Sequence, residues 1–213
     1  MSTPQPPQPS PPHASPLRPY AAGDAAALYD VCLRTADNGA DATPRYADPA
    51  LLGHIWVGPY LALEPELATV LDDGAGPQGY VVGALDTRAF EARCKREWWP
   101  ALRREYPLSS VPAGSPDARI VDLLHHPSVA PARAVADHPA HLHINLLPRW
   151  QSGGWGRRLI ETLLEALTTA GSPGVHLGVA TTNARAIGFY ERLGFSPLED
   201  DAAGTLYLGR RLS

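Results

Sequence analysis

Residues 146–171 read LLPRWQSGGWGRRLIETLLEALTTAG, and this stretch decides the fold. Apolar residues lead into Pro148, the turn QSGGWG follows, and a long amphipathic segment begins at Arg157. This order predicts a strand, a tight turn and a helix, which gathers free backbone N–H groups beside the positive end of the helix dipole. Glycine lacks a Cβ atom, so the turn can take positive φ and let a ligand approach closely. We interpret the turn as a candidate phosphate site, the alternative being a glycine-rich connector without a ligand.

Two motifs in this half of the chain resemble the signatures of the GCN5-related N-acetyltransferase (GNAT) superfamily. Gln151, followed by Gly154 and Gly156, is similar to the Q/R-x-x-G-x-G/A motif that holds the pyrophosphate of acetyl-coenzyme A (acetyl-CoA) in that family. The later stretch NARAIGFYERLGF, which begins at Asn183, is similar to the family's second signature and follows at the expected distance. A dinucleotide-binding fold is less consistent, because the spacing is not GxGxxG and no βαβ repeat follows.

The resemblance implies an α/β (α+β) architecture, the GNAT fold. Its mixed, mostly antiparallel central sheet carries helices on both faces, with a helical insertion between the third and fourth core strands. Residues 87–140 are too long for a bare loop, and Phe90, Cys94, Trp98 and Leu102 recur there at helical spacing. The patterns predict short extended structure over 17–20, strands over 68–71, 79–85, 141–147, 174–180 and 205–208, and helices over 25–36, 118–124 and 184–193. Residues 51–63, interrupted by Gly58 and Pro59, are expected to form a helix followed by a turn. Asp24 is expected to cap the first of these helices.

The layout is also similar to the acetyltransferase-like domain at the C-terminus of O-GlcNAcase, over residues 17–212. The similarity rests on four features of the sequence. They are the run TADNGAD that begins at Thr35, the strand with Gly79-Tyr80 that ends in Asp86, the helix with Cys94-Lys95 and Trp98, and the pair Gly209-Arg210 near the end. The glycine loop is degraded in the animal domain and whole in this chain. The resemblance therefore implies acetyl-CoA binding without implying that the chain acetylates histones.

Composition bounds the remaining possibilities. The 213 residues suit one domain over residues 17–213, preceded by a tail over residues 1–16 that is rich in Pro, Ser and Gln and is expected to be disordered. A net charge of −4 gives no basic footprint for nucleic acid, and no apolar run is long enough to cross a membrane. Two cysteines favour a reducing, cytoplasmic compartment over a disulfide framework. A monomer and a homodimer are both consistent with the sequence.

The resemblance assigns the donor site to two strands and the loop. Unpaired backbone of Leu146 and Leu147 faces that of Val179 and Ala180 across a V-shaped slot for the pantetheine arm, and Asn183 contacts the same arm. Phe189 flanks it. The pyrophosphate is expected at the loop, which comprises Gln151, Ser152, Gly153, Gly154, Trp155, Gly156 and Arg157.

The reaction needs an acid, a base and an acceptor site. Tyr190 matches the family position that donates a proton to the departing thiolate, although it could simply pack the helix on the sheet. His143 is a candidate base, or else a structural strand residue, and Asp86 at a strand end is the alternative. Asn145 stands where the O-GlcNAcase-type domain carries Asp, and an amide cannot act as a base.

The acceptor is expected to be a primary amine on a small molecule or a protein. Asp37, Asp41 and Asn145 are candidate acceptor residues, but the two aspartates also fit a turn at a helix end closed by Gly39. The histidines show no metal-binding spacing, so no metal is expected. Two alternatives stay open: a non-catalytic acetyl-CoA-binding or protein-interaction module, and an enzyme that modifies aminoglycosides or other drugs, which needs an acidic acceptor cleft.

Overall fold

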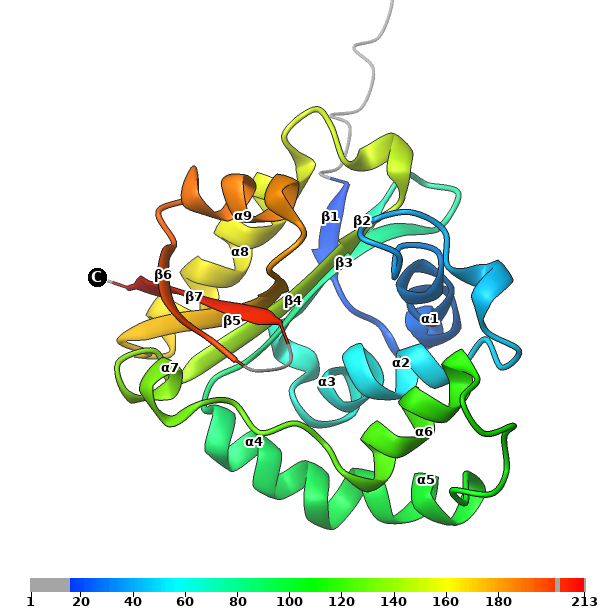
Figure 1. Ribbon diagram of the computed structural model, residues 1–213. Coiled ribbons are helices and arrows are strands. Elements are labelled where there is room, and N and C mark those ends of the chain that lie inside the picture. The colour runs from blue at the N-terminus through cyan, green and yellow to red at the C-terminus, as the bar shows by residue number, and fades with distance from the viewer. Residues whose placement is uncertain (1–15, 202–203, 213) are drawn as a thin grey trace, which may run out of the picture.

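A single seven-stranded sheet forms the centre of the computed structural model, which describes residues 16–201 and 204–212 (Figure 1). The strand order is β1-β2-β3-β4-β5-β7-β6, and every neighbouring pair is antiparallel except β4 with β5. The strands are β1 Leu17–Pro19, β2 Ala68–Asp72, β3 Pro77–Ala84, β4 Ala140–Leu146, β5 Gly174–Ala180, β6 Ser196–Asp200 and β7 Thr205–Arg211. The mixed, mostly antiparallel sheet is confirmed.

Helices cover both faces of this sheet, as expected (Figure 1). They are α1 Ala25–Leu33, α2 Leu51–Trp56, α3 Gly58–Leu63, α4 Thr87–Arg93, α5 Trp99–Glu105, α6 Pro116–His125, α7 Ala132–Ala136, α8 Trp155–Thr169 and α9 Ala184–Glu191. A π-helical turn over Cys94–Trp98 joins α4 to α5. Helices α4 to α7 form the insertion between β3 and β4, and α4 to α6 lie below the sheet in Figure 1.

The two faces of the sheet bury separate apolar cores. Val70, Tyr80 and Val82 face the core under α1 to α3, whereas Leu71 and Val81 face the core under α8. This alternation follows from the two-residue period of a strand. Helix α8 contributes its apolar stripe to the second core, through Leu159, Ile160, Leu163, Leu164 and Leu167.

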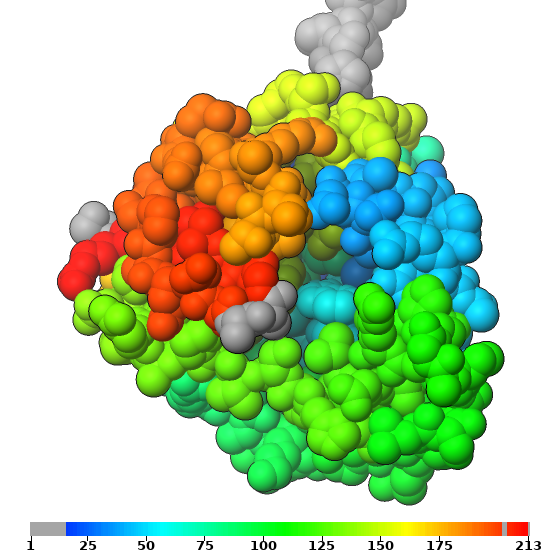
Figure 2. All heavy atoms as spheres, in the orientation of Figure 1, coloured from blue at the N-terminus to red at the C-terminus, as the bar shows by residue number. Residues whose placement is uncertain are grey.

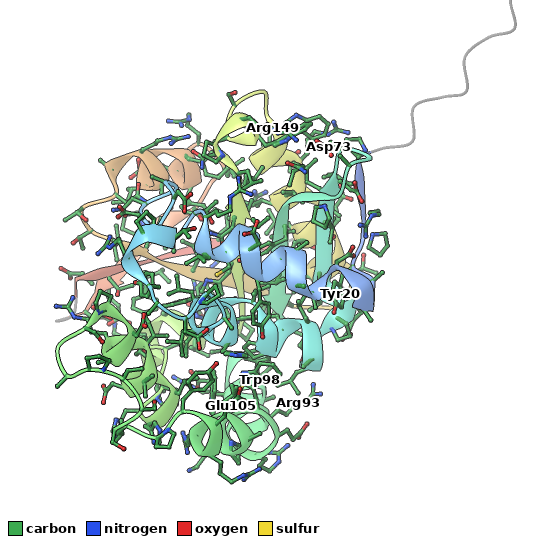
Figure 3. All side chains as sticks on the ribbon, turned by 90° about the vertical axis from the view of Figure 1, so that its right-hand side faces the viewer. Tyr20, Asp73, Arg93, Trp98, Glu105 and Arg149 are labelled. Carbon is green, nitrogen blue, oxygen red and sulfur yellow. The ribbon has the colours of Figure 1, made fainter. Side chains whose placement is uncertain are left out.

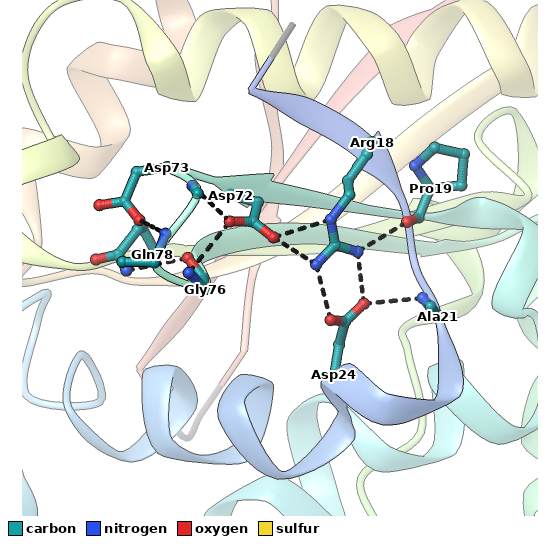
Figure 4. A network of polar contacts seen from close by, with 10 residues as sticks. Arg18, Pro19, Ala21, Asp24, Asp72, Asp73, Gly76 and Gln78 are labelled. Atoms are coloured by element: carbon teal, nitrogen blue, oxygen red, sulfur yellow. Dashed lines mark hydrogen bonds and ion pairs between the residues drawn. The ribbon is translucent and has the colours of Figure 1, made fainter. Parts of the chain in front are cut away.

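Asp24 is the N-cap residue of α1, as expected, but its side chain makes no cap hydrogen bond. The Asp24 carboxylate accepts hydrogen bonds from both terminal nitrogens of Arg18, at 2.7 and 2.8 Å, and from the Ala21 N–H at 2.9 Å (Figure 4). Arg18 also donates to Asp72 at the end of β2, at 2.7 and 3.0 Å. The guanidinium holds the pKa of Asp24 below its usual range, because its hydrogen bonds and charge stabilise the carboxylate over the neutral acid. The network therefore ties the edge strand β1 to the first helix.

Several elements differ from the sequence prediction. Helix α1 ends at Leu33 rather than at residue 36, and residues 51–63, expected to form a helix followed by a turn, form two helices, α2 and α3, that are separated at Val57. Strand β6 was not predicted at all, because Pro197 and the acidic residues after it give no apolar alternation. The tail expected over residues 1–16 lies outside the described residues, except Pro16.

The apolar helices of this fold are short. Within residues 16–201 and 204–212, no helix has both the length and the apolar character that crossing a bilayer requires.

Candidate active site

The glycine-rich loop leads directly into α8, as predicted. Gly153 and Gly154 have φ of +77° and +82°, a region that side chains disfavour. An added Cβ at Gly154 would meet no atom within 4 Å, so this position opens into free space. Gly156 is needed for a different reason: its added Cβ would lie 3.1 Å from Cζ of Phe189 on α9. The loop glycines therefore serve both a strained turn and a close helix contact.

The loop presents a row of free backbone donors. The first amide of this segment that donates to a backbone acceptor is that of Arg158, which bonds to the Gly154 carbonyl at 3.1 Å. The N–H groups of residues 152–157 have no acceptor among the residues that the structure describes. Consecutive N–H groups at a helix start, together with the helix dipole, form a cradle for an anion such as a diphosphate. The loop therefore fits the group that the sequence predicted.

Side chains on both flanks hold the loop in place. The Gln151 amide donates to the carbonyls of Gly39 and Leu146, at 2.7 and 2.9 Å, and accepts from Arg185 at 3.0 Å. Arg149 pairs with Asp73 in the β2–β3 turn and donates to Gln78, and Figure 3 shows Arg149 and Asp73 together at one end of the molecule. Gln151 thus positions the loop through protein contacts.

Strands β4 and β5 separate next to this loop. Their parallel pairing covers only Ala140 with Val175 and His141 with His176. Beyond that point β4 stays paired with β3, and β5 stays paired with β7, so the two facing strand edges are open. Open strand edges carry backbone donors and acceptors that can bind an extended, amide-bearing chain.

The opening between the strands is the mouth of a cavity of about 630 Å³, here called the first cavity. Figure 2 shows the molecule hollowed between the orange segment that carries α9, the blue segment after α1 and the green insertion. The first cavity brings together predicted residues from four segments: His143, Asn145, Leu146, Gln151, Gly154, Gly156, Arg157, Asn183, Phe189 and Tyr190. Asn183 also caps α9, since its side-chain oxygen accepts the Ala186 N–H at 3.1 Å.

Four predicted donor residues do not line the first cavity. The Leu147 side chain is buried in the core under α1 to α3, and its N–H donates to the Gln78 carbonyl. Trp155 packs edge-on against Trp150 and lies under the guanidinium of Arg158. Ser152 and Gly153 reach the site only through the row of free N–H groups.

Tyr190 lies on α9 with its ring against Phe189 and Phe195. Its hydroxyl has no hydrogen-bond partner among the described residues. Burial raises the pKa of Tyr190 to about 12, so the phenol keeps its proton at neutral pH. A protonated, unpaired hydroxyl at the wall of the first cavity can serve as a proton donor.

His143 belongs to a cluster of aromatic and imidazole rings. Its ring lies edge-on to Tyr60, at 5.4 Å between centroids, and burial lowers the pKa of His143 to about 4. Neighbouring His141 is fully engaged: Tyr60 Oη lies 2.7 Å from Nε2, and Thr87 Oγ1 lies 2.7 Å from Nδ1. His143 has no hydrogen-bond partner in the described chain, which leaves its nitrogens available to a ligand.

Asn145 is held in a polar chain that runs from β3 through β4 to the segment after α1. Its side-chain oxygen accepts the Tyr80 hydroxyl at 2.9 Å, and its nitrogen donates to Thr35 Oγ1 at 2.6 Å. Thr35 in turn donates to the Val31 carbonyl at 2.7 Å. Both ends of the amide are therefore occupied by protein groups at the wall of the first cavity.

The three candidate aspartates do not line the first cavity. Asp37 pairs with Arg45 at 2.9 Å, and Asp41 accepts the Thr43 N–H at 2.8 Å. Asp86 caps α4 by accepting the Ala89 N–H at 2.9 Å. An ion pair, a turn bond and a cap bond thus account for the three carboxylates in turn.

Sequence reasoning missed two basic residues at the first cavity. Arg185 and Arg192 lie on α9 and at its end, and both line the cavity beside Arg157. Their presence in the motif stretch was a usable signal, because cations next to an anion cradle add attraction for a polyphosphate.

Comparisons with known proteins agree with this geometry. A model of the acetyltransferase (GNAT) family matches residues 120–195. Protein O-GlcNAcase from Rattus norvegicus is 28% identical over 201 residues, which cover 92% of this chain and 22% of the rat protein. The Mus musculus protein matches to the same extent. The chain thus spans about a fifth of the length of these curated relatives.

Solved structures share the architecture. The crystal structure of SsHAT matches with a TM-score of 0.85 at 46% sequence identity, covering 92% of this chain and 98% of that chain. A GNAT superfamily phosphinothricin acetyltransferase from Sinorhizobium meliloti, solved in complex with acetyl-CoA, matches with a TM-score of 0.56. That match covers 92% of this chain and 88% of the other, at 16% identity, and so reflects a shared fold.

Proposed function

Because the chain belongs to the acetyltransferase (GNAT) family, we propose that it transfers the acetyl group of acetyl-CoA to a primary amine. One observation carries this proposal: the free N–H groups of residues 152–157 stand beside the open edges of β4 and β5. This arrangement matches the two polar parts of the coenzyme, a diphosphate and a chain with two amides.

The donor site follows from these two features. The N–H row receives the diphosphate, with Arg157, Arg185 and Arg192 supplying positive charge around it. The pantetheine arm runs between β4 and β5 and places its thioester near Tyr190 and His143, which line the same cavity. Acetyl-CoA supplies the activated acyl group when bound.

The transfer balances as follows. The amine nitrogen attacks the thioester carbonyl, a C–N bond forms, and the C–S bond breaks with its electron pair on sulfur. The Tyr190 hydroxyl gives its proton to that sulfur and regains one from water. Its raised pKa keeps the phenol protonated at neutral pH but also makes it a weaker acid, so the transfer requires the hydroxyl to lie within hydrogen-bond reach of the sulfur. The proton lost by the amine goes to water or to His143, whose ring is neutral above about pH 4.

Replacing Tyr190 tests this assignment. Tyr190→Phe removes the proton but keeps the ring packing, so turnover should fall about 100-fold while the acetyl-CoA Kd stays within about twofold. Thiol release and mass spectrometry of the product measure turnover with a panel of primary amines, and calorimetry measures binding. Tyr20→Phe, far from the first cavity, is the matched control and should behave like the original protein. Equal turnover in the two variants would exclude Tyr190 as the acid.

A non-catalytic coenzyme binder is the second candidate function. It is favoured by the placement of Asp37, Asp41 and Asp86, none of which lines the first cavity to act as a base. Calorimetric binding of acetyl-CoA without an acetylated product from any amine of the panel would select this alternative over the enzyme.

A further inference from the structure

A second, larger cavity lies on the other side of the β4–β5 opening. Its volume is about 990 Å³, and it is lined mainly by the insertion helices, by α2 and α3, and by β7. The first cavity and the second cavity share five lining residues: Trp56, His143, Gly178, Val179 and Ala180. A group that enters the second cavity can therefore meet a thioester held in the first cavity at His143 and Val179.

The walls of the second cavity are aromatic and apolar. Tyr60 and Phe90 stack at 4.5 Å between ring centroids, and Trp56, Trp99 and Tyr207 add further ring faces. Its volume lies in the range of cavities that hold small organic ligands. An aromatic lining favours a ligand with an aromatic body, which can pack against the edges and exposed faces of these rings.

The charges around the second cavity oppose a polycationic ligand. Among its described lining residues, Glu91 is the only carboxylate, and it is already occupied by Arg88 at 2.8 Å and by the Ala130 N–H at 2.9 Å. Lys95 and Arg103 line the same cavity, so cations outnumber acids. A second or third ammonium on the ligand would meet repulsion without a free acid to pair with.

Several polar side chains line the second cavity, and most of them already have partners. The Tyr60–His141–Thr87 chain is internally satisfied, with 2.7 Å contacts on both ring nitrogens of His141. His176 is anchored by Nδ1 to the His138 carbonyl at 2.7 Å. His143, whose ring nitrogens have no hydrogen-bond partner in the described chain, remains to accept from an incoming amine.

From these observations we infer that the second cavity holds the acceptor, a small-molecule amine on an aromatic body with no further positive charge. This inference rests on the proposed function and specifies its substrate class. It disfavours polyamines, aminoglycosides and lysine-rich peptides as acceptors.

A panel of defined amines tests the substrate class. We expect kcat/KM for 2-phenylethylamine and tryptamine to exceed that for putrescine, spermidine, kanamycin and a lysine-containing peptide by about tenfold or more. A preference for any of the polycations over 2-phenylethylamine would overturn the inference while leaving the acetyl-transfer proposal intact.

Charge reversal at the wall sharpens the test. Lys95→Glu should shift the kcat/KM ratio toward putrescine by about fivefold or more, because it places a free carboxylate at the second cavity. Arg104→Glu makes the same change on α5 outside the lining residues and should leave the ratio unchanged. Equal ratios in the two variants would contradict the inference.

Direct binding separates failure of the cavity from failure of the enzyme. Calorimetry with 2-phenylethylamine on the coenzyme-free protein should show binding that Tyr207→Leu weakens about fivefold or more, with the acetyl-CoA Kd unchanged. Such binding without turnover supports the assignment of the second cavity as the amine site and refutes only the transfer reaction. Absence of 2-phenylethylamine binding refutes the cavity assignment, whether or not other amines are acetylated.

Discussion

The first cavity and the second cavity face each other across β4 and β5, yet the chain encodes them differently. The groups proposed to bind the coenzyme at the first cavity lie within residues 143–193, and many of them are backbone groups set by local glycines and caps, although residues between Cys32 and Trp56 complete its wall. The second cavity gathers side chains from segments between Ile55 and Tyr207 that meet only in the folded chain. A local motif therefore defines the donor, while tertiary packing defines the acceptor.

The largest expected effect is a loss of folding stability at acidic pH, which comes from histidines that line the second cavity. Burial lowers the pKa of His141, His143 and His176, and that of His143 falls from 6.5 to about 4. These rings stay neutral in the folded protein but protonate near pH 6.5 in the unfolded chain. Stability present above pH 6.5 is therefore lost as the pH falls toward 4, by on the order of 3 kcal/mol for His143 alone.

Urea unfolding at pH 7.5 and pH 4.5 measures this loss. His143→Gln should lose about 2 kcal/mol less free energy of unfolding on acidification than the original protein does. His126→Gln, at an exposed histidine paired with Asp122, serves as the control and should lose as much as the original. Identical losses in all three proteins would show that His143 titrates alike in both states.

Reversing a charge at the first cavity should give the next largest effect. Arg185 lines that cavity and contacts Gln151, so Arg185→Glu should raise the acetyl-CoA Kd about tenfold, with a smaller effect at high salt. Arg119→Glu, on α6 outside both cavities, should leave the Kd unchanged in the same calorimetric titration. A similar Kd for the two variants would remove α9 from the phosphate site.

The sequence could predict the binding groups of the first cavity because short-range sequence motifs encode them. The order of glycines, Asn183 and Tyr190 specifies a turn, a cap and a helix face without knowledge of distant segments. Gln151 and the aspartates show the limit of such reasoning. The Gln151 side chain donates a hydrogen bond to the Gly39 carbonyl, more than a hundred positions away, and the Asp37 carboxylate pairs with Arg45 instead of facing an acceptor.

The second cavity had no comparable local signal. Phe90 and Cys94 were correctly placed on a helical pattern, but the pattern does not reveal that this helix stacks Phe90 on Tyr60. Strand β6 escaped prediction for a related reason, since its place at the sheet edge is set by pairing with β7. Long-range pairing, rather than propensity, decides these features.

The smallest expected effect comes from removing two matched helix caps, one on α9 at the first cavity and one on α6, which lines the second cavity. Asn183 accepts the Ala186 N–H at the start of α9, and Ser115 accepts the Ala118 N–H at the start of α6, both at 3.1 Å. Asn183→Ala and Ser115→Ala should each lower the free energy of unfolding by about 1 kcal/mol. Only Asn183→Ala should also weaken acetyl-CoA binding, by a few-fold, and equal binding by both would contradict the division between the two sides.

The most direct measurement compares the two ends of α8. Gly154 and Gly171 have φ of +82° and +83°, and an added Cβ at either would meet no atom within 4 Å. Gly154→Leu and Gly171→Leu therefore introduce similar backbone strain, but only the first places a side chain at the row of free N–H groups. Calorimetry should show at least a roughly 30-fold loss of acetyl-CoA affinity for Gly154→Leu and less than a twofold change for Gly171→Leu. Undiminished affinity in a folded Gly154→Leu protein would contradict the central claim that this loop binds the diphosphate.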